Sequence, residues 1–234
     1  MVRLFSNYKF QQSLFLKIIY NVIYRYTLIK AARRCAAKQL VEYTRVKAKP
    51  VCALGNTLEK YILFIPREGE RQRSLLNYTH MVNFMKTYFD VPVIIPNLKY
   101  GCHLQDNIIY FKTAIGFISP HGAAFTNIIF IGNKATVIQF VPPKPHPFTG
   151  PAQSYANQIK ELGHKYMEVQ TKSNSDPRWD LFFDLKQFVE KICQPNNPSQ
   201  KVNSMFDSWL PKNILIKLCS SSEGISEIIL SITK

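Results

Sequence analysis

Short apolar segments alternate with amphipathic segments through the middle of this chain, and this alternation constrains the fold more than any other feature. The apolar segments are rich in β-branched and aromatic residues, which is typical of buried strands: 61–65, 91–95, 114–118, 135–140 and 166–169. The segments between them have apolar residues at helical spacing: 78–89, 104–112, 152–162 and 180–192. Because strands that alternate with helices form mostly parallel sheets, the sequence predicts an α/β, Rossmann-like domain over residues 55–193.

The two ends of the chain differ from this middle part. The net charge is +15, and residues 1–50 hold eleven Lys or Arg residues against one acidic residue. Apolar residues recur at helical steps between these basic residues, which predicts a basic helical arm over residues 1–54. Such a helix can pack on a domain or contact a membrane surface, whereas no recognised nucleic-acid-binding motif accompanies it, so no nucleic acid partner is expected. Residues 194–234 are rich in polar residues and Pro, and no structure is predicted for this tail.

Several classes of site are not supported. The five cysteines include no Cys-x-x-Cys pair, which argues against a structural zinc site and a redox dithiol, and their odd number predicts no disulfide framework. No Asp-x-Asp clasp is present, so no metal is expected, and no Gly-x-Ser-x-Gly elbow supports acyl hydrolysis. The early apolar stretch is interrupted by Lys17, Asn21 and Arg25, so no signal peptide or transmembrane span is evident.

Residues 119–127 read Ser-Pro-His-Gly-Ala-Ala-Phe-Thr-Asn and follow a predicted strand, which indicates a strand, a tight turn and a helix. Gly122 allows a sharp turn and lets a ligand approach the backbone closely. The small Ala123 leaves the first helical amides open, and these amides together with the helix dipole favour a phosphate. The same residues also fit a plain tight turn with small side chains for packing and His121 as a cap.

Three polar residues come at the ends of three predicted strands: Arg67, His121 and Gln139. Parallel strands place their carboxyl ends at one edge of the sheet, where open α/β sheets bind ligands. Arg67, and Arg73 in the same loop, can hold a phosphate through paired hydrogen bonds. Gln139 can bond to ribose hydroxyls, so the three strand ends predict a nucleotide-diphosphate site. The alternative is that the two arginines are solvated and pair with acidic residues of their own loop.

This combination resembles glycosyltransferase family 61, a group that includes the extracellular O-linked N-acetylglucosamine transferase, the protein O-mannose N-acetylglucosaminyltransferase and plant β-1,2-xylosyltransferases. The resemblance rests on residues 62–67, 73–77, 120–127 and 137–140. It implies an inverting transferase that moves N-acetylglucosamine or xylose from a UDP-sugar to a protein or glycan acceptor, without a further cofactor. It also implies a location in the lumen of the endoplasmic reticulum or Golgi.

The family has a GT-B fold, and the resemblance implies that this chain corresponds to its C-terminal, donor-binding half. It implies a catalytic role for His121 and donor-binding roles for Arg67, Arg73, Asn77, Gly122, Ala123, Asn127 and Gln139. Gln139 stands where the family has Glu, so the residue at that position lacks the family's charge. A second hypothesis is therefore a truncated nucleotide-binding or interaction protein without catalysis, and a third is a protein that binds a membrane or nucleic acid through its basic arm.

Overall fold

The computed structural model describes residues 60–67, 74–96, 104–132, 134–142, 149–173, 181–194, 206 and 208–220. The predicted basic arm and Arg73 lie outside these described residues. Within the described part of the chain, no helix has both the length and the hydrophobicity that a membrane crossing requires.

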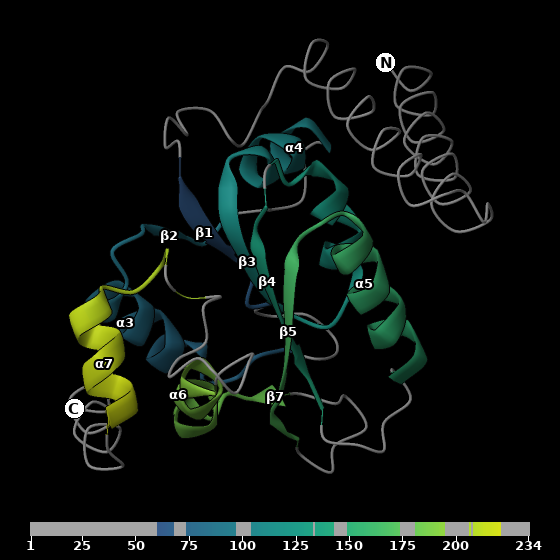
Figure 1. The fold of residues 1–234 in the computed structure, drawn as a ribbon. Coiled ribbons are helices and arrows are strands. Elements are labelled where there is room, and N and C mark those ends of the chain that lie inside the picture. Colours follow the sequence, from purple (N-terminus) through teal and green to yellow (C-terminus); the bar gives the residue numbers. More distant parts are fainter. Residues whose placement is uncertain are drawn as a thin grey trace, which may run out of the picture.

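A sheet of five parallel strands forms the centre of the domain (Figure 1), in the order β2-β1-β3-β4-β5. Its strands are β1 (Tyr61–Phe64), β2 (Val93–Ile94), β3 (Ala114–Pro120), β4 (Thr136–Val141) and β5 (Lys165–Gln170). Each strand lies within or overlaps one of the five apolar segments, and all are parallel, so the predicted α/β, Rossmann-like arrangement is confirmed.

Helices cover both faces of this sheet. They are α3 (Tyr78–Tyr88), α4 (Leu104–Lys112), the 3₁₀ helix η1 (Ala123–Phe130), α5 (Thr149–Glu161), α6 (Leu185–Cys193) and α7 (Lys212–Ser220). One face packs against α3, α6 and α7, and the other packs against α4, η1 and α5 (Figure 1). Successive strand residues point to opposite faces. Phe64 therefore belongs to the core under α3 and α6, whereas Leu63 belongs to the core under α4 and η1.

Two local predictions need correction. The segment 123–130 is helical as expected, but it is a 3₁₀ helix, in which the Phe125 amide donates to the Gly122 carbonyl at 3.1 Å. The helix predicted to begin at residue 180 begins instead at Leu185, after the strand β7 (Leu181–Phe182), which pairs with β6 (Lys172–Ser173). The start of α6 is set by Asp184, whose side chain accepts a hydrogen bond from the Gln187 amide at 3.1 Å.

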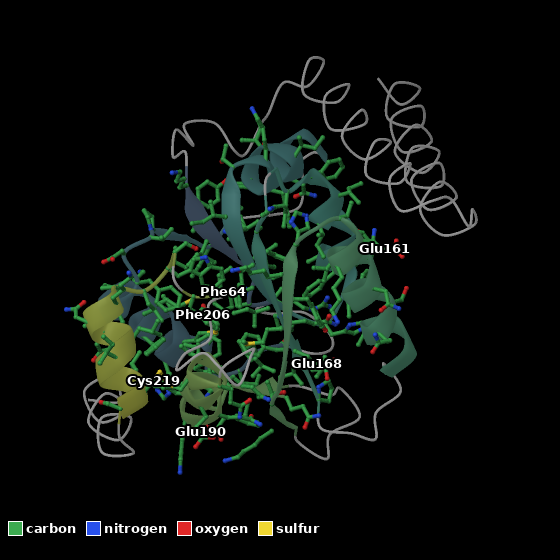
Figure 2. The ribbon with its side chains drawn as sticks, viewed as in Figure 1. Phe64, Glu161, Glu168, Glu190, Phe206 and Cys219 are labelled. Atoms are coloured by element: carbon green, nitrogen blue, oxygen red, sulfur yellow. A yellow bond between two sulfur atoms is a disulfide. The ribbon has the colours of Figure 1, made fainter. Side chains whose placement is uncertain are left out.

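Part of the C-terminal tail belongs to the domain. Phe206, Trp209 and Leu210 are buried in the same core as α3 and α6. A disulfide between Cys193 and Cys219 joins the end of α6 to α7. Phe206 and Cys219 are labelled in Figure 2. The sequence, with its odd number of cysteines, did not predict this bond. Among the described residues beyond 193, Phe206, Trp209, Leu210 and helix α7 therefore share the core of the domain.

Candidate functional site

The carboxyl ends of β1, β3 and β4 meet at one edge of the sheet. The Ile65 amide donates to the Ile118 carbonyl at 3.0 Å, and the Ser119 hydroxyl donates to the Ile65 carbonyl at 3.0 Å. The His121 amide donates to the Phe140 carbonyl at 2.8 Å, which holds the end of β3 against β4. The structure therefore brings the segments that carry Arg67, His121 and Gln139 to the same edge.

Arg67 and Gly122 are in direct contact at this edge. A Cβ atom at Gly122 would lie only 2.1 Å from Nη1 and 3.1 Å from Cζ of Arg67, so the guanidinium lies against the bare glycine backbone. Gly122 has an extended backbone with φ of 164°, which any residue can adopt, so the close approach of Arg67 and not the backbone angle is what requires glycine here. The left-handed residue is Arg67, with φ of 59°, a conformation that costs a non-glycine residue about 1–3 kcal/mol and clusters at functional sites.

A chain of hydrogen bonds runs across the sheet behind this contact. Gln139 Nε2 lies 2.5 Å from His121 Nδ1, and the Tyr166 hydroxyl donates to Gln139 Oε1 at 3.0 Å. Gln139 is completely buried and His121 is 2% exposed. Tyr166 also lies 3.4 Å from a carboxylate oxygen of Glu168, which is labelled on β5 in Figure 2. Both ends of the Gln139 amide are thus engaged inside the domain, and because the side chain is completely buried, a direct bond from it to a ribose would require this side chain to become accessible.

Burial and a neighbouring carboxylate determine the protonation state of Tyr166. Burial raises the pKa of Tyr166 well above its usual value, and the neighbouring Glu168 carboxylate raises it further. Tyr166 therefore remains a neutral phenol and keeps its proton for donation. The ring centre of Tyr155, on α5, lies 5.6 Å from that of His121 and 5.6 Å from that of Phe125, so α5 packs one aromatic ring against both the imidazole and η1.

The remaining predicted site residues have different positions. Asn77 stands at the N-cap position of α3, but its side chain forms no capping hydrogen bond there. Its amide group instead donates to the Phe183 carbonyl at 2.8 Å and accepts from the Phe183 amide at 2.6 Å. Ala123 is exposed and Asn127 is partly buried, both on η1. The roles of these residues and of Arg73 toward a ligand stay predictions.

Sequence reasoning missed Tyr166 and Glu168. Both lie on β5 and alternate with the buried Met167 and Val169, and Glu168 is the register partner of Gln139. The sequence did show that Tyr166 and Glu168 are two positions apart on a predicted strand, and this spacing places both side chains on one face of the sheet. Only the strand order shows that this face is the one that carries Gln139.

A cavity of about 530 Å³ lies farther along the same edge, between the end of β5 and the start of α6. Its lining is polar and contains both signs of charge: Gln170, Thr171, Lys172, Asp184, Lys186, Gln187 and Glu190. None of the predicted site residues lines it. No group of three His, Cys, Asp or Glu side chains among the described residues could hold a metal ion.

Comparison with known proteins identifies one family. The sequence profile of Glycosyltransferase 61 matches residues 14–138, which is more than half of the 234-residue chain. The match includes Arg67, Asn77 and the 119–127 stretch, and it also covers most of the predicted basic arm. A search of characterised proteins found no significant match.

Proposed function

The chain belongs to glycosyltransferase family 61, and on this premise we propose that the edge formed by β1, β3 and β4 binds the diphosphate of a UDP-sugar. The proposed reaction is inverting transfer of N-acetylglucosamine or xylose to a protein or glycan acceptor. In this proposal Arg67 and the amides after Gly122 bind the diphosphate and offset the charge of the leaving UDP. His121 lies next to these groups in sequence and contacts the same ligand.

The observation that carries this proposal is the guanidinium of Arg67 against the backbone of Gly122. A planar guanidinium binds two phosphate oxygens at once, and a backbone without a Cβ lets those oxygens approach the following amides. The contact lies at the carboxyl ends of parallel strands, which is where folds of this class bind nucleotides. The left-handed conformation of Arg67 supports the same interpretation, since strain of this kind is concentrated at binding sites.

The test is calorimetric titration of the full chain with UDP at fixed salt. Arg67→Ala removes a charge-assisted hydrogen-bond donor, so UDP binding should weaken by about 1.5–3 kcal/mol, or about 10- to 150-fold. Arg67→Gly should weaken binding equally, but it also relieves the left-handed strain, so its thermal stability should equal or exceed that of Arg67→Ala. A loss of affinity without a loss of stability separates a ligand contact from a structural role.

Matched controls come from the predicted arm. Lys30→Ala and Arg34→Ala each remove one positive charge, as Arg67→Ala does, and UDP affinity should be unchanged in both. If the arm variants lose affinity while Arg67→Ala keeps it, the assignment of the edge is wrong and the basic arm is the functional surface.

Sugar transfer distinguishes the enzyme from the second hypothesis, a nucleotide-binding protein without catalysis. The assay measures release of UDP from UDP-N-acetylglucosamine and from UDP-xylose in the presence of peptide and glycan acceptors. Release that depends on the acceptor and is lost in Arg67→Ala supports the transferase. Tight UDP binding without any release supports the silent binding protein.

We also propose that the protein acts in the secretory pathway, the location that membership of this family suggests. The Cys193–Cys219 disulfide supports this location, because disulfides persist in oxidising compartments and are rare in the cytosol. Peptide mapping of the native protein under non-reducing conditions tests this point, and free thiols at both positions would contradict it.

A further inference from the structure

The hydrogen bonds around Gln139 define which nitrogen of His121 carries the proton. Tyr166 donates to Gln139 Oε1, so the other end of the amide is the NH₂ group, which has donors only. This NH₂ group faces His121 Nδ1 at 2.5 Å. A proton on Nδ1 would point at another N–H, so Nδ1 accepts the hydrogen bond and the ring proton is on Nε2.

The alternative arrangement is less consistent with the distances. If Tyr166 donated to Glu168, Gln139 would turn its oxygen toward His121, and the ring proton would be on Nδ1. The hydroxyl of Tyr166 lies 3.0 Å from Gln139 Oε1 but 3.4 Å from Glu168 Oε2, so the donor is directed at Gln139. The Lys160 ammonium lies over the face of the Tyr166 ring, 5.7 Å from its centre.

We propose that Tyr166 and Gln139 are positioning residues that hold His121 as its Nε2–H tautomer, so that His121 donates a hydrogen bond to an anionic ligand oxygen and does not act as a base. A donor at Nε2 is complementary to a diphosphate oxygen, and it can stabilise charge on the leaving group without accepting a proton. The identity of the ligand rests on the proposed UDP site, whereas the tautomer rests only on the contacts within this domain.

The tautomer is measured directly by NMR of the ligand-free protein labelled with ¹⁵N-histidine. The chain has five histidines, and the His121 signals are assigned from their loss in His121→Gln. The expected result at neutral pH is a protonated Nε2 and an unprotonated Nδ1 for His121. A proton on Nδ1 of His121 would overturn the proposal, whether or not the protein binds UDP.

Two substitutions test whether Gln139 and Tyr166 set this state. Gln139→Glu replaces the NH₂ donor with an acceptor, so the Nδ1 position should gain a proton. Tyr166→Phe removes the hydroxyl that orients the amide, so the His121 spectrum should show loss of the pure Nε2–H form. Tyr88→Phe is the control. It removes a hydroxyl from α3, which packs on the opposite face of the sheet from Gln139, and it should leave the His121 signals unchanged. Unchanged His121 signals in Gln139→Glu would refute the role of Gln139.

A matched pair at His121 itself tests donation to the ligand. The amide nitrogen of a Gln side chain reaches about as far as Nε2, whereas that of Asn reaches about as far as Nδ1. His121→Gln should therefore bind UDP within about threefold of the original protein, and His121→Asn should bind about tenfold more weakly. Equal losses in both variants would contradict donation from Nε2. If the original protein does not bind UDP, the proposed function fails, and the NMR experiment still decides the tautomer.

Discussion

Removal of the Cys193–Cys219 disulfide should destabilise the domain without weakening the nucleotide site. The two cysteines are 26 positions apart and their Cα atoms are separated by 5.2 Å. A crosslink over a loop of this length lowers the entropy of the unfolded chain by about 12 cal/mol/K, which corresponds to about 3.5 kcal/mol at 25 °C. The double variant Cys193→Ala/Cys219→Ala should lose stability of this order.

The disulfide is positioned to stabilise the packing of the C-terminal segment. It joins α6, which contributes Phe188 and Ile192 to the core, to α7, which contributes Leu215 and Leu218. The loop that it closes includes Trp209, which is completely buried. Without the covalent bond, only the packing of these buried side chains holds the C-terminal segment on the core. The segment from 206 to 220 should therefore be the first part to open.

Thermal unfolding measures this loss of stability. In a chain of this size, a loss of 1 kcal/mol lowers Tm by about 2–4 °C, so the double variant should melt about 7–14 °C below the original protein. Dithiothreitol should lower the Tm of the original protein toward that of the double variant and leave the variant unchanged. UDP affinity, measured below both transitions, should differ by less than twofold, because α6 and α7 cover the face of the sheet opposite η1. Equal Tm values for the two proteins under oxidising conditions would refute the argument.

Two further predictions concern the fold. Gly116→Ala should reduce the free energy of unfolding in urea by about 1–3 kcal/mol, because its Cβ would lie 2.2 Å from Cζ2 of the buried Trp209. Asp184→Ala should cost about 1 kcal/mol at pH 7, the usual value of an N-cap. Burial raises the pKa of Asp184, but the Gln187 amide and the Lys172 ammonium lower it more, so its net pKa in the folded protein is below the ordinary value. The stabilisation is therefore present above about pH 4 and is lost as pH falls through the lowered pKa. Urea midpoints should consequently differ less between variant and original at pH 2.5 than at pH 7, and an equal difference at both pH values would refute this assignment.

The order of the strands and helices could be predicted because each has a local signal. Segment 61–65 has apolar residues that are buried on both faces, and α4 lies over the predicted range 104–112. The strand β7 had no such signal, because Leu181 and Phe182 continue the apolar face of the helix that follows. Its position depends on Asn77, which bonds to the backbone of Phe183 across 106 positions of sequence.

The C-terminal segment illustrates the same limit. Trp209 fits where it does because Gly116 has no side chain, and these two residues are 93 positions apart in the sequence. The composition of residues 194–234 contains Pro and Ser clusters and therefore resembles a loop. Neither the packing of Trp209 nor the pairing of Cys193 with Cys219 has a local pattern, since both depend on the assembled sheet.

The candidate site was predictable where it depends on strand ends and not where it depends on register. Arg67, His121 and Gln139 follow directly from the rule that parallel strands end at one edge. Tyr166 joins them only because β4 pairs with β5, with Val137 opposite Tyr166 and Gln139 opposite Glu168. A shift of one residue in that register would turn Tyr166 to the other face and leave the Gln139 amide without its donor.

Gly122 determines where the positive charge of Arg67 lies at this edge of the sheet. Any side chain at Gly122 would occupy the position of the Arg67 guanidinium, so the residue controls where the cation lies even though its own φ of 164° suits any amino acid. The residue before it, His121, is fixed from the opposite side by Gln139 and Tyr166. This short segment therefore places the Arg67 cation over Gly122 and the imidazole ring of His121 beside it, each held by a different strand. Because these supports differ, a substitution at Gly122 should act on UDP binding through Arg67, whereas one at Gln139 should act through His121.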